Sequence, residues 1–309
     1  MSEVKKIATR EAFGETLVEL GKKHPELVVL DADLAAATKT AVFKKSFPDR
    51  HFDCGIAEAN MMGVAAGLSL VGKIPVASSF AMFATGRAYE QIRNSIGYPH
   101  LNVKIGASHA GITVGEDGAT HQAIEDIAIM RALPSMTILC PCDAEEAGRA
   151  VRAAAAMEGP VYLRLARLAT PVFSAGMPFE IGKANIMREG GDVALITCGL
   201  MVEACINAAE LLEKKGIHAT VVNMHTIKPL DEALVRELAV KMPLYTVEEH
   251  SIIGGLGDAV AAVVAEHGGR LHKIGLNDCF GQSGKPAELL DFYGLTPEKI
   301  AARIESTLK

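Results

Sequence analysis

The segment 52–69 constrains the fold of this chain most, because its pattern changes from strand-like to helix-like within a few residues. A short run that begins at Phe52 stops at Gly55, and small and apolar residues then continue at helical spacing. Glycine permits turn conformations that other residues resist. The pattern therefore predicts a strand, a tight turn and a buried helix, with Glu58 in the first turn of that helix.

Glu58 is a carboxylate with almost no polar neighbours in this segment. The helix dipole favours a carboxylate in the first turn, whereas an apolar pocket raises the pKa of a carboxyl group. Folds use such opposed effects to prepare a carboxyl group for proton transfer near neutral pH. On pattern alone, the simpler interpretation is that Glu58 only caps the helix.

The rest of the chain alternates between strand and helix patterns. Before residue 169, strands are predicted at 27–30, 74–80, 103–108, 136–140 and 161–167, and helices at 9–23, 35–47, 83–95 and 143–157. After a predicted linker at 169–190, strands are predicted at 193–198, 219–223 and 244–247, and helices at 201–216, 231–240 and 257–266. This alternation predicts an α/β fold with mainly parallel sheets, in a first domain 1–175 and a smaller second domain 186–309.

Composition excludes several classes of protein. The net charge of −6 and the absence of a long basic run argue against a nucleic-acid partner. No apolar run approaches about 18 residues, so we expect no membrane span. The six cysteines lie mostly in apolar runs without zinc spacing, which predicts reduced thiols and a cytoplasmic protein. We find no magnesium-binding pattern and expect no metal ligands in this chain.

The second informative stretch is the loop 108–122, which contains two histidines, two acids and three glycines. It connects a predicted buried strand to a helix that we expect to begin near Ala123. Glycine-rich loops at such junctions usually carry function. We therefore take His109 and His121 as candidate functional residues and interpret Glu116 as structural.

Three further positions have two interpretations each. Phe80 and Phe83 either share a core turn or form a slot for a flat heterocycle. Asp33 follows the strand 27–30, so it either lies near a ligand at the carboxyl edge of the sheet or caps the helix 35–47. Arg164 and Arg167 face opposite sides of a regular strand, so one could reach a ligand while the other pairs at the surface.

Two motifs resemble one enzyme family. Gly-Ile-Ala-Glu-Ala-Asn-Met-Met-Gly at 55–63 resembles the motif around the catalytic glutamate of transketolases and 1-deoxyxylulose-5-phosphate synthases. In that superfamily the glutamate hydrogen-bonds N1′ of thiamine diphosphate and starts the proton relay that forms a carbanion, and the cofactor carries the difficult chemistry. Val-Gly-Glu-Asp-Gly-Ala-Thr-His-Gln at 114–122 is nearer to transketolase. The resemblance runs from about Ile7 to the C-terminus.

The resemblance implies roles for the candidate residues. Glu58 and His121 would be catalytic, and Asp117 would contact a ketose hydroxyl while His121 contacts oxygens near the reacting carbon. The distal sugar phosphate would be held by Arg10, His109 and Arg167, since the planar fork of arginine matches phosphate. The cofactor would be contacted by Glu58, by Phe80 and Phe83 against the pyrimidine, and by Asp33 across a subunit boundary.

Two substitutions and one absence depart from the family pattern. Ala37 stands where the family often has a phosphate-binding serine, so a sugar with another anion, or none, stays possible. Gly86 replaces a third aromatic residue of the pyrimidine pocket. The chain also lacks the Gly-Asp-Gly motif with a downstream Asn through which transketolases hold the diphosphate and magnesium.

The absent motif implies that this chain is the C-terminal subunit of a split transketolase. An N-terminal partner subunit would supply the Mg²⁺ ligands, and the two chains would form an α2β2 assembly. The alternatives are half of a related thiamine enzyme, such as a deoxyxylulose synthase or a 2-oxo-acid dehydrogenase beta subunit, and a non-catalytic module of the same fold. The loop 114–122 disfavours the related enzymes.

Overall fold

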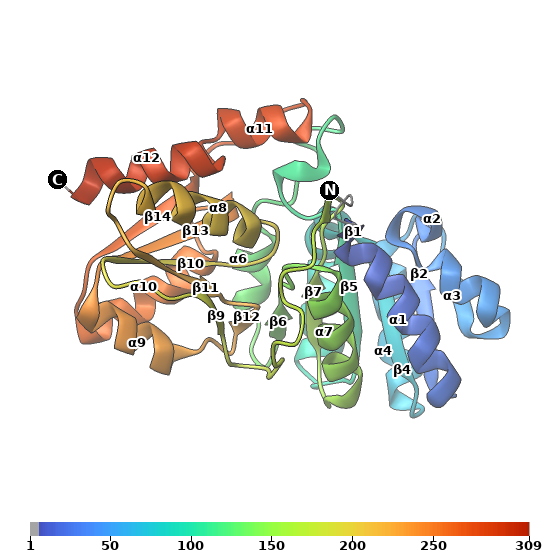
Figure 1. Cartoon of the computed structure of the whole chain (residues 1–309). Coiled ribbons are helices and arrows are strands. Elements are labelled where there is room, and N and C mark those ends of the chain that lie inside the picture. Colours follow the sequence, from blue (N-terminus) through green and yellow to red (C-terminus); the bar gives the residue numbers. More distant parts are fainter. Residues whose placement is uncertain (1–5, 309) are drawn as a thin grey trace.

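The computed structural model describes residues 6–308, which form two main sheets (Figure 1). The first sheet has the strand order β12-β6-β7-β5-β4-β2-β3, and every neighbouring pair is parallel except β12 with β6. Its strands are β2 Leu27–Asp31, β3 His51–Asp53, β4 Ile74–Phe80, β5 Lys104–Ser108, β6 Thr137–Leu139, β7 Val161–Arg164 and β12 Thr226–Lys228.

Helices cover both faces of this sheet, as strands that are apolar on both sides require. On one face, Phe13 and Leu17 of α1 pack with Val29 and Val76. The helices of this domain are α1 Thr9–Lys23, α2 Ala35–Thr38, α3 Ala41–Ser46, α4 Glu58–Leu70, α5 Tyr89–Gln91, α6 Asp126–Arg131 and α7 Ala144–Ala156, with 3₁₀ turns η1 Pro48–Arg50 and η4 Ile112–Val114. The opposite face is covered by α4 and α6, so the predicted two-sided α/β domain is confirmed.

The second sheet has the order β14-β13-β10-β11-β9, parallel except for β9. Its strands are β9 Asn185–Arg188, β10 Val193–Thr197, β11 Ala219–Asn223, β13 Leu244–Ser251 and β14 Leu271–Leu276. Its helices are α8 Met201–Glu213, α9 Glu232–Lys241, α10 Leu256–His267, α11 Pro286–Phe292 and α12 Pro297–Leu308. Between residues 6 and 308, none of the helices combines the length and the hydropathy that crossing a bilayer requires.

The two domains are joined more closely than the sequence suggested. β12 follows the second domain's β11 in the chain, yet it pairs with β6 of the first sheet. The predicted linker 169–190 contains β8 Ala169–Thr170, which pairs with β1 Ile7–Ala8, and it also contains β9. One apolar cluster extends from Met130 of α6 to Ile196 and Val260 of the second domain. The domain junction is therefore a packed interface.

Three predicted helices differ from those observed. The helix 35–47 divides into α2 and α3 because Lys39 adopts φ +72° between them. The helix 83–95 consists of the π-helical segments η2 Phe83–Arg87 and η3 Ile92–Gly97 on either side of α5. The helix expected near Ala123 begins three residues later as α6. π-Helical turns are frequent at functional sites.

Candidate active site

The candidate residues gather at the carboxyl ends of the parallel strands of the first sheet, where open α/β sheets bind ligands. Glu58 follows β3, Phe80 ends β4 and His109 directly follows β5. Arg10 lies in the first turn of α1, and Arg167 lies beyond the end of β7. Residues scattered over the first half of the sequence therefore share one edge of the sheet.

Glu58 is delivered by a turn that the sequence predicted correctly. Gly55 adopts φ +68°, and α4 begins at Glu58, which is 1% exposed. Asp53 Oδ1 accepts hydrogen bonds from the backbone N–H groups of Gly55, at 3.0 Å, and Asp33, at 3.1 Å. Asp53 therefore ties the turn before Glu58 to the loop after β2.

The expectation that Glu58 has almost no polar neighbours was wrong. Arg87 Nη1 donates to Glu58 Oε2 at 2.7 Å, and the Arg87 guanidinium also lies over the Phe83 ring, 5.0 Å from its centroid. Arg87 belongs to η2, whose wider turns the sequence pattern did not reveal. Since the predicted helix 83–95 also contains Arg93, no local signal identified Arg87 as the partner.

Four rings form one cluster beside this ion pair. Phe80 and Phe83 are stacked with centroids 5.8 Å apart and an interplanar angle of 13°. His109 stacks on Phe80 at 3.8 Å, and His121 meets Phe83 edge-on at 5.1 Å. Both histidines singled out from the loop 108–122 are therefore brought to the aromatic pair. Flat aromatic faces next to a buried carboxylate suit an aminopyrimidine ring.

His109 is neutral and its tautomer follows from its partners. Arg10 Nη1 lies 3.1 Å from His109 Nε2 and also donates to the carbonyl of Ala37 at 2.8 Å. Arginine only donates, so Nε2 accepts and the ring proton is on Nδ1, which donates to Ser108 Oγ at 2.9 Å. Burial, together with the nearby charges of Arg10 and Arg167, lowers the pKa of His109 to about 3.

Arg164 and Arg167 lie in different surroundings, but these are not the surroundings that we predicted. Arg167 is partly exposed and donates to the Val114 carbonyl, with Glu116 Oε2 3.4 Å away, so it borders the loop 108–122. Arg164 is 5% exposed and pairs with the buried Asp126 at 2.8 Å. Arg164 therefore forms an internal ion pair and not the surface pair that we expected.

Asp33 and Asp117 are exposed at the same edge of the sheet. Asp33 adopts φ +62° and does not cap α2, since Asp31 Oδ1 accepts the Leu34 N–H instead. The capping interpretation of Asp33 was therefore wrong, and its role near a cofactor stays a prediction.

Among residues 6–308, no three His, Cys, Asp or Glu side chains gather closely enough to hold a metal ion.

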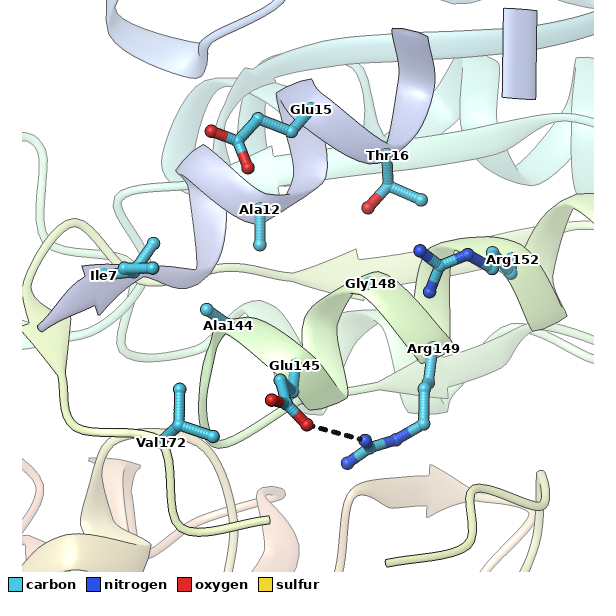
Figure 2. Close-up of a pocket in the computed structure, with 10 residues that line it drawn as sticks. All are labelled: Ile7, Ala12, Glu15, Thr16, Ala144, Glu145, Gly148, Arg149, Arg152 and Val172. Atoms are coloured by element: carbon cyan, nitrogen blue, oxygen red, sulfur yellow. Dashed lines mark ion pairs between the residues drawn. The ribbon is translucent and has the colours of Figure 1, made fainter. Parts of the chain in front are cut away.

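A hollow of about 440 Å³ lies elsewhere, between α1 and α7 (Figure 2). None of the predicted site residues lines it. Three of its charged side chains already pair, Glu145 with Arg149 at 3.5 Å and Arg152 with Glu19 outside the hollow at 2.6 Å. We therefore place the candidate active site at the sheet edge and not in this hollow.

Known proteins match nearly the whole chain. Residues 5–172 match the transketolase pyrimidine-binding domain and residues 182–300 the transketolase C-terminal domain. The chain is 53% identical over 305 residues to a putative transketolase C-terminal section from Methanocaldococcus jannaschii, which covers 97% of this chain and 96% of the relative. It is 43% identical over 294 residues to a 6-deoxy-6-sulfo-D-fructose transketolase subunit from a Clostridium species, with 94% and 91% covered.

A solved structure described as a split gene transketolase, inactive beta4 tetramer, has the same fold. It superimposes with a TM-score of 0.90 at 52% sequence identity, and the match covers 97% of this chain and 98% of the other. The fold, the motif around Glu58 and the two matched domains agree with one another. The chain therefore belongs to the transketolase family and comprises its pyrimidine-binding and C-terminal domains.

Proposed function

We propose that this chain is the C-terminal subunit of a two-subunit transketolase that moves a two-carbon ketol unit from a ketose to an aldose. The observation that carries the proposal is the position of Glu58, a carboxylate 1% exposed at the carboxyl edge of the sheet and beside a stacked aromatic pair. This arrangement fits the pyrimidine end of thiamine diphosphate. When bound, that cofactor supplies the electron sink for carbon–carbon bond cleavage.

Glu58 would handle the proton of the reaction. Its Oε2 atom accepts from Arg87, which leaves Oε1 to share a proton with N1′ of the pyrimidine. Phe80 and Phe83 would hold the flat ring by stacking. Asp33, on the loop after β2, would lie near the cofactor at the boundary between subunits.

The substrate would lie along the cationic side of the ring cluster. Because His109 is neutral, the positive charge for a distal anion comes from Arg10 and Arg167. His109 would act through Arg10, which its Nε2 atom holds by accepting a hydrogen bond. Asp117 and His121 would contact hydroxyl oxygens nearer the reacting carbon. The Clostridium relative is named for a sulfonated sugar, which supports a phosphate or a sulfonate as the anion on the substrate proposed for this chain.

The residues that bind the diphosphate and the Mg²⁺ ion would come from an N-terminal partner subunit. We propose that the two chains form an α2β2 assembly in the cytoplasm. Magnesium requires oxygen ligands in near-octahedral positions and usually works together with phosphates. The relative solved as an inactive tetramer of beta chains supports both self-association and the need for a second chain.

Calorimetry should accordingly detect thiamine diphosphate binding only in the mixture of both subunits. Tight, magnesium-dependent binding by this chain alone would contradict the split.

The decisive experiment is Glu58→Gln in the reconstituted enzyme, assayed with xylulose 5-phosphate and an aldose phosphate acceptor. We expect the rate to fall by at least about 100-fold, because general acid–base groups contribute about 10²–10⁴-fold. The matched control is Glu232→Gln, which changes the exposed first residue of α9 in the same way. Wild-type rates from Glu58→Gln reject the assignment. Turnover of pyruvate but not of xylulose 5-phosphate favours the related thiamine enzymes.

A further inference from the structure

The loop 110–122 carries Asp117 and His121, and it combines three glycines with several contacts to the second domain. Gly111, Gly115 and Gly118 adopt φ values of +79°, +90° and +75°, in the left-handed region that glycine enters readily. Gly111 N–H donates to the Ala123 carbonyl at 2.9 Å, which closes the base of the loop. Glycine-rich segments lose much conformational freedom on folding, so the position of this loop depends on contacts from outside it.

The first outside contact is Glu249, at the end of β13 in the second domain. Its Oε2 atom accepts from the backbone N–H of Thr113, at 3.2 Å, and from the Thr113 hydroxyl, at 2.8 Å. Glu249 is 3% exposed, and a Cβ atom added to Gly111 would lie 2.3 Å from its carboxylate. A buried carboxyl group therefore holds the beginning of the loop directly against the second domain.

The second contact holds the end of the loop. Gln122 Nε2 donates to the Ile112 carbonyl at 3.1 Å and to the Gln282 carbonyl of the second domain at 3.0 Å. The approach is close, since a Cβ atom added to Gly281 would lie 1.7 Å from Gln122 Oε1. One added to Gly118 would lie 2.4 Å from the Ser283 hydroxyl. The segment 281–284 therefore packs directly on the loop.

We propose that the second domain positions the substrate-binding loop, and that Glu249 and Gln122 are the positioning residues. This inference rests on the proposed function, which gives Asp117 and His121 their substrate contacts. Neither positioning residue has to touch substrate itself. Small misplacements of binding groups lower catalytic efficiency strongly, so a loop released from these contacts would bind the ketose poorly.

The test compares Glu249→Gln with Glu248→Gln. The two glutamates are adjacent and buried, but Glu248 accepts from Leu256 N–H at 2.7 Å and Gly257 N–H at 2.8 Å within its own domain. Hydrogen exchange of the isolated chain should become about fivefold to tenfold faster across 111–122 in Glu249→Gln, because a neutral acceptor binds more weakly than a carboxylate. In Glu248→Gln the faster exchange should be confined to the start of α10.

A kinetic arm tests the consequence in the reconstituted enzyme. Glu249→Gln should raise KM for the ketose donor about tenfold while kcat changes less than threefold, because ground-state and transition-state binding are lost together. If Glu249→Gln folds poorly, Gln122→Met takes its place in the test. This variant removes the side-chain donor of Gln122 from the loop and should also raise KM for the ketose donor.

Two results overturn the inference. One is loop exchange that stays at the wild-type rate, or that rises equally in Glu248→Gln. The other is faster loop exchange without any change in KM. If wild-type subunits show no ketol transfer with any partner, the proposed function fails, and the exchange experiment still decides whether the second domain holds the loop.

Discussion

The buried ion pair between Arg164 and Asp126 offers the sharpest test of how this fold is held together. The substitution Arg164→Met keeps a long apolar side chain but removes the cation that donates to Asp126 Oδ2 at 2.8 Å. Tyr162 would then be the remaining donor to that oxygen, at 2.7 Å. The carbonyls of Ala123 and Glu249 would also lose the Arg164 Nη2 donor, at 3.3 Å each.

The expected loss of unfolding free energy at pH 7 is about 3–5 kcal/mol. Arg164 is 5% exposed and Asp126 is fully buried, and removing one partner of a buried pair typically costs about this much. Coulomb's law at this separation, with an effective dielectric constant of about 20, gives about 6 kcal/mol as an upper estimate. The same substitution at the exposed Arg152, which pairs with Glu19, should cost less than about 1 kcal/mol.

The pH dependence of the loss follows from the pKa of Asp126. Burial acts to raise that pKa, but Arg164 and His250 outweigh burial and lower it. The pair therefore stabilises the fold above the ordinary aspartate pKa of about 4, and the stabilisation is lost as the pH falls through the lower, folded-state pKa. Without Arg164 the buried carboxyl group protonates at higher pH, so the difference between wild type and variant shrinks in acid.

Urea unfolding of the isolated chain at pH 7 and at pH 4, followed by circular dichroism, measures both quantities. We expect the difference between wild type and Arg164→Met to be smaller at pH 4, with Arg152→Met as the control for a lost arginine. A loss below about 1 kcal/mol at pH 7 refutes the argument for a desolvated charge. An equal loss at both pH values shows that packing and not charge is responsible.

Two further predictions concern the candidate active site. Arg87→Met should destabilise the chain by about 1–3 kcal/mol because it leaves the buried Glu58 carboxylate without its donor. In a double-mutant cycle with Glu58→Gln the two losses should not add, and additive losses mean that the contact is energetically silent. His109, with a pKa near 3 in the fold and about 6.5 when unfolded, should make wild type lose about 2 kcal/mol between pH 7.5 and pH 5. His109→Gln should remove most of that loss in urea titrations, and an unchanged pH dependence contradicts the neutral, buried ring.

Local patterns predicted much of the fold. The alternation of apolar runs was sufficient for two α/β domains, and α1 begins and ends where its apolar stripe does. The strand, turn and helix around Glu58 were also predictable, because a glycine between two apolar periodicities is a short-range signal. Two helix predictions were wrong, one at Lys39 and one at η2. At both places the backbone departs from a regular α-helix for reasons that residue type does not reveal.

By itself, the sequence determined the alternation of strands and helices, and it predicted the candidate site residues, whose roles stay predictions. Only the tertiary structure decided their partners. Arg87 reaches Glu58 across 29 residues, Arg164 reaches Asp126 across 38, and Glu249 reaches Thr113 across 136. Periodicity describes neighbours within a few turns, whereas these contacts depend on how two sheets pack. The contacts of the second domain with the loop 110–122 could therefore be found only in the tertiary structure.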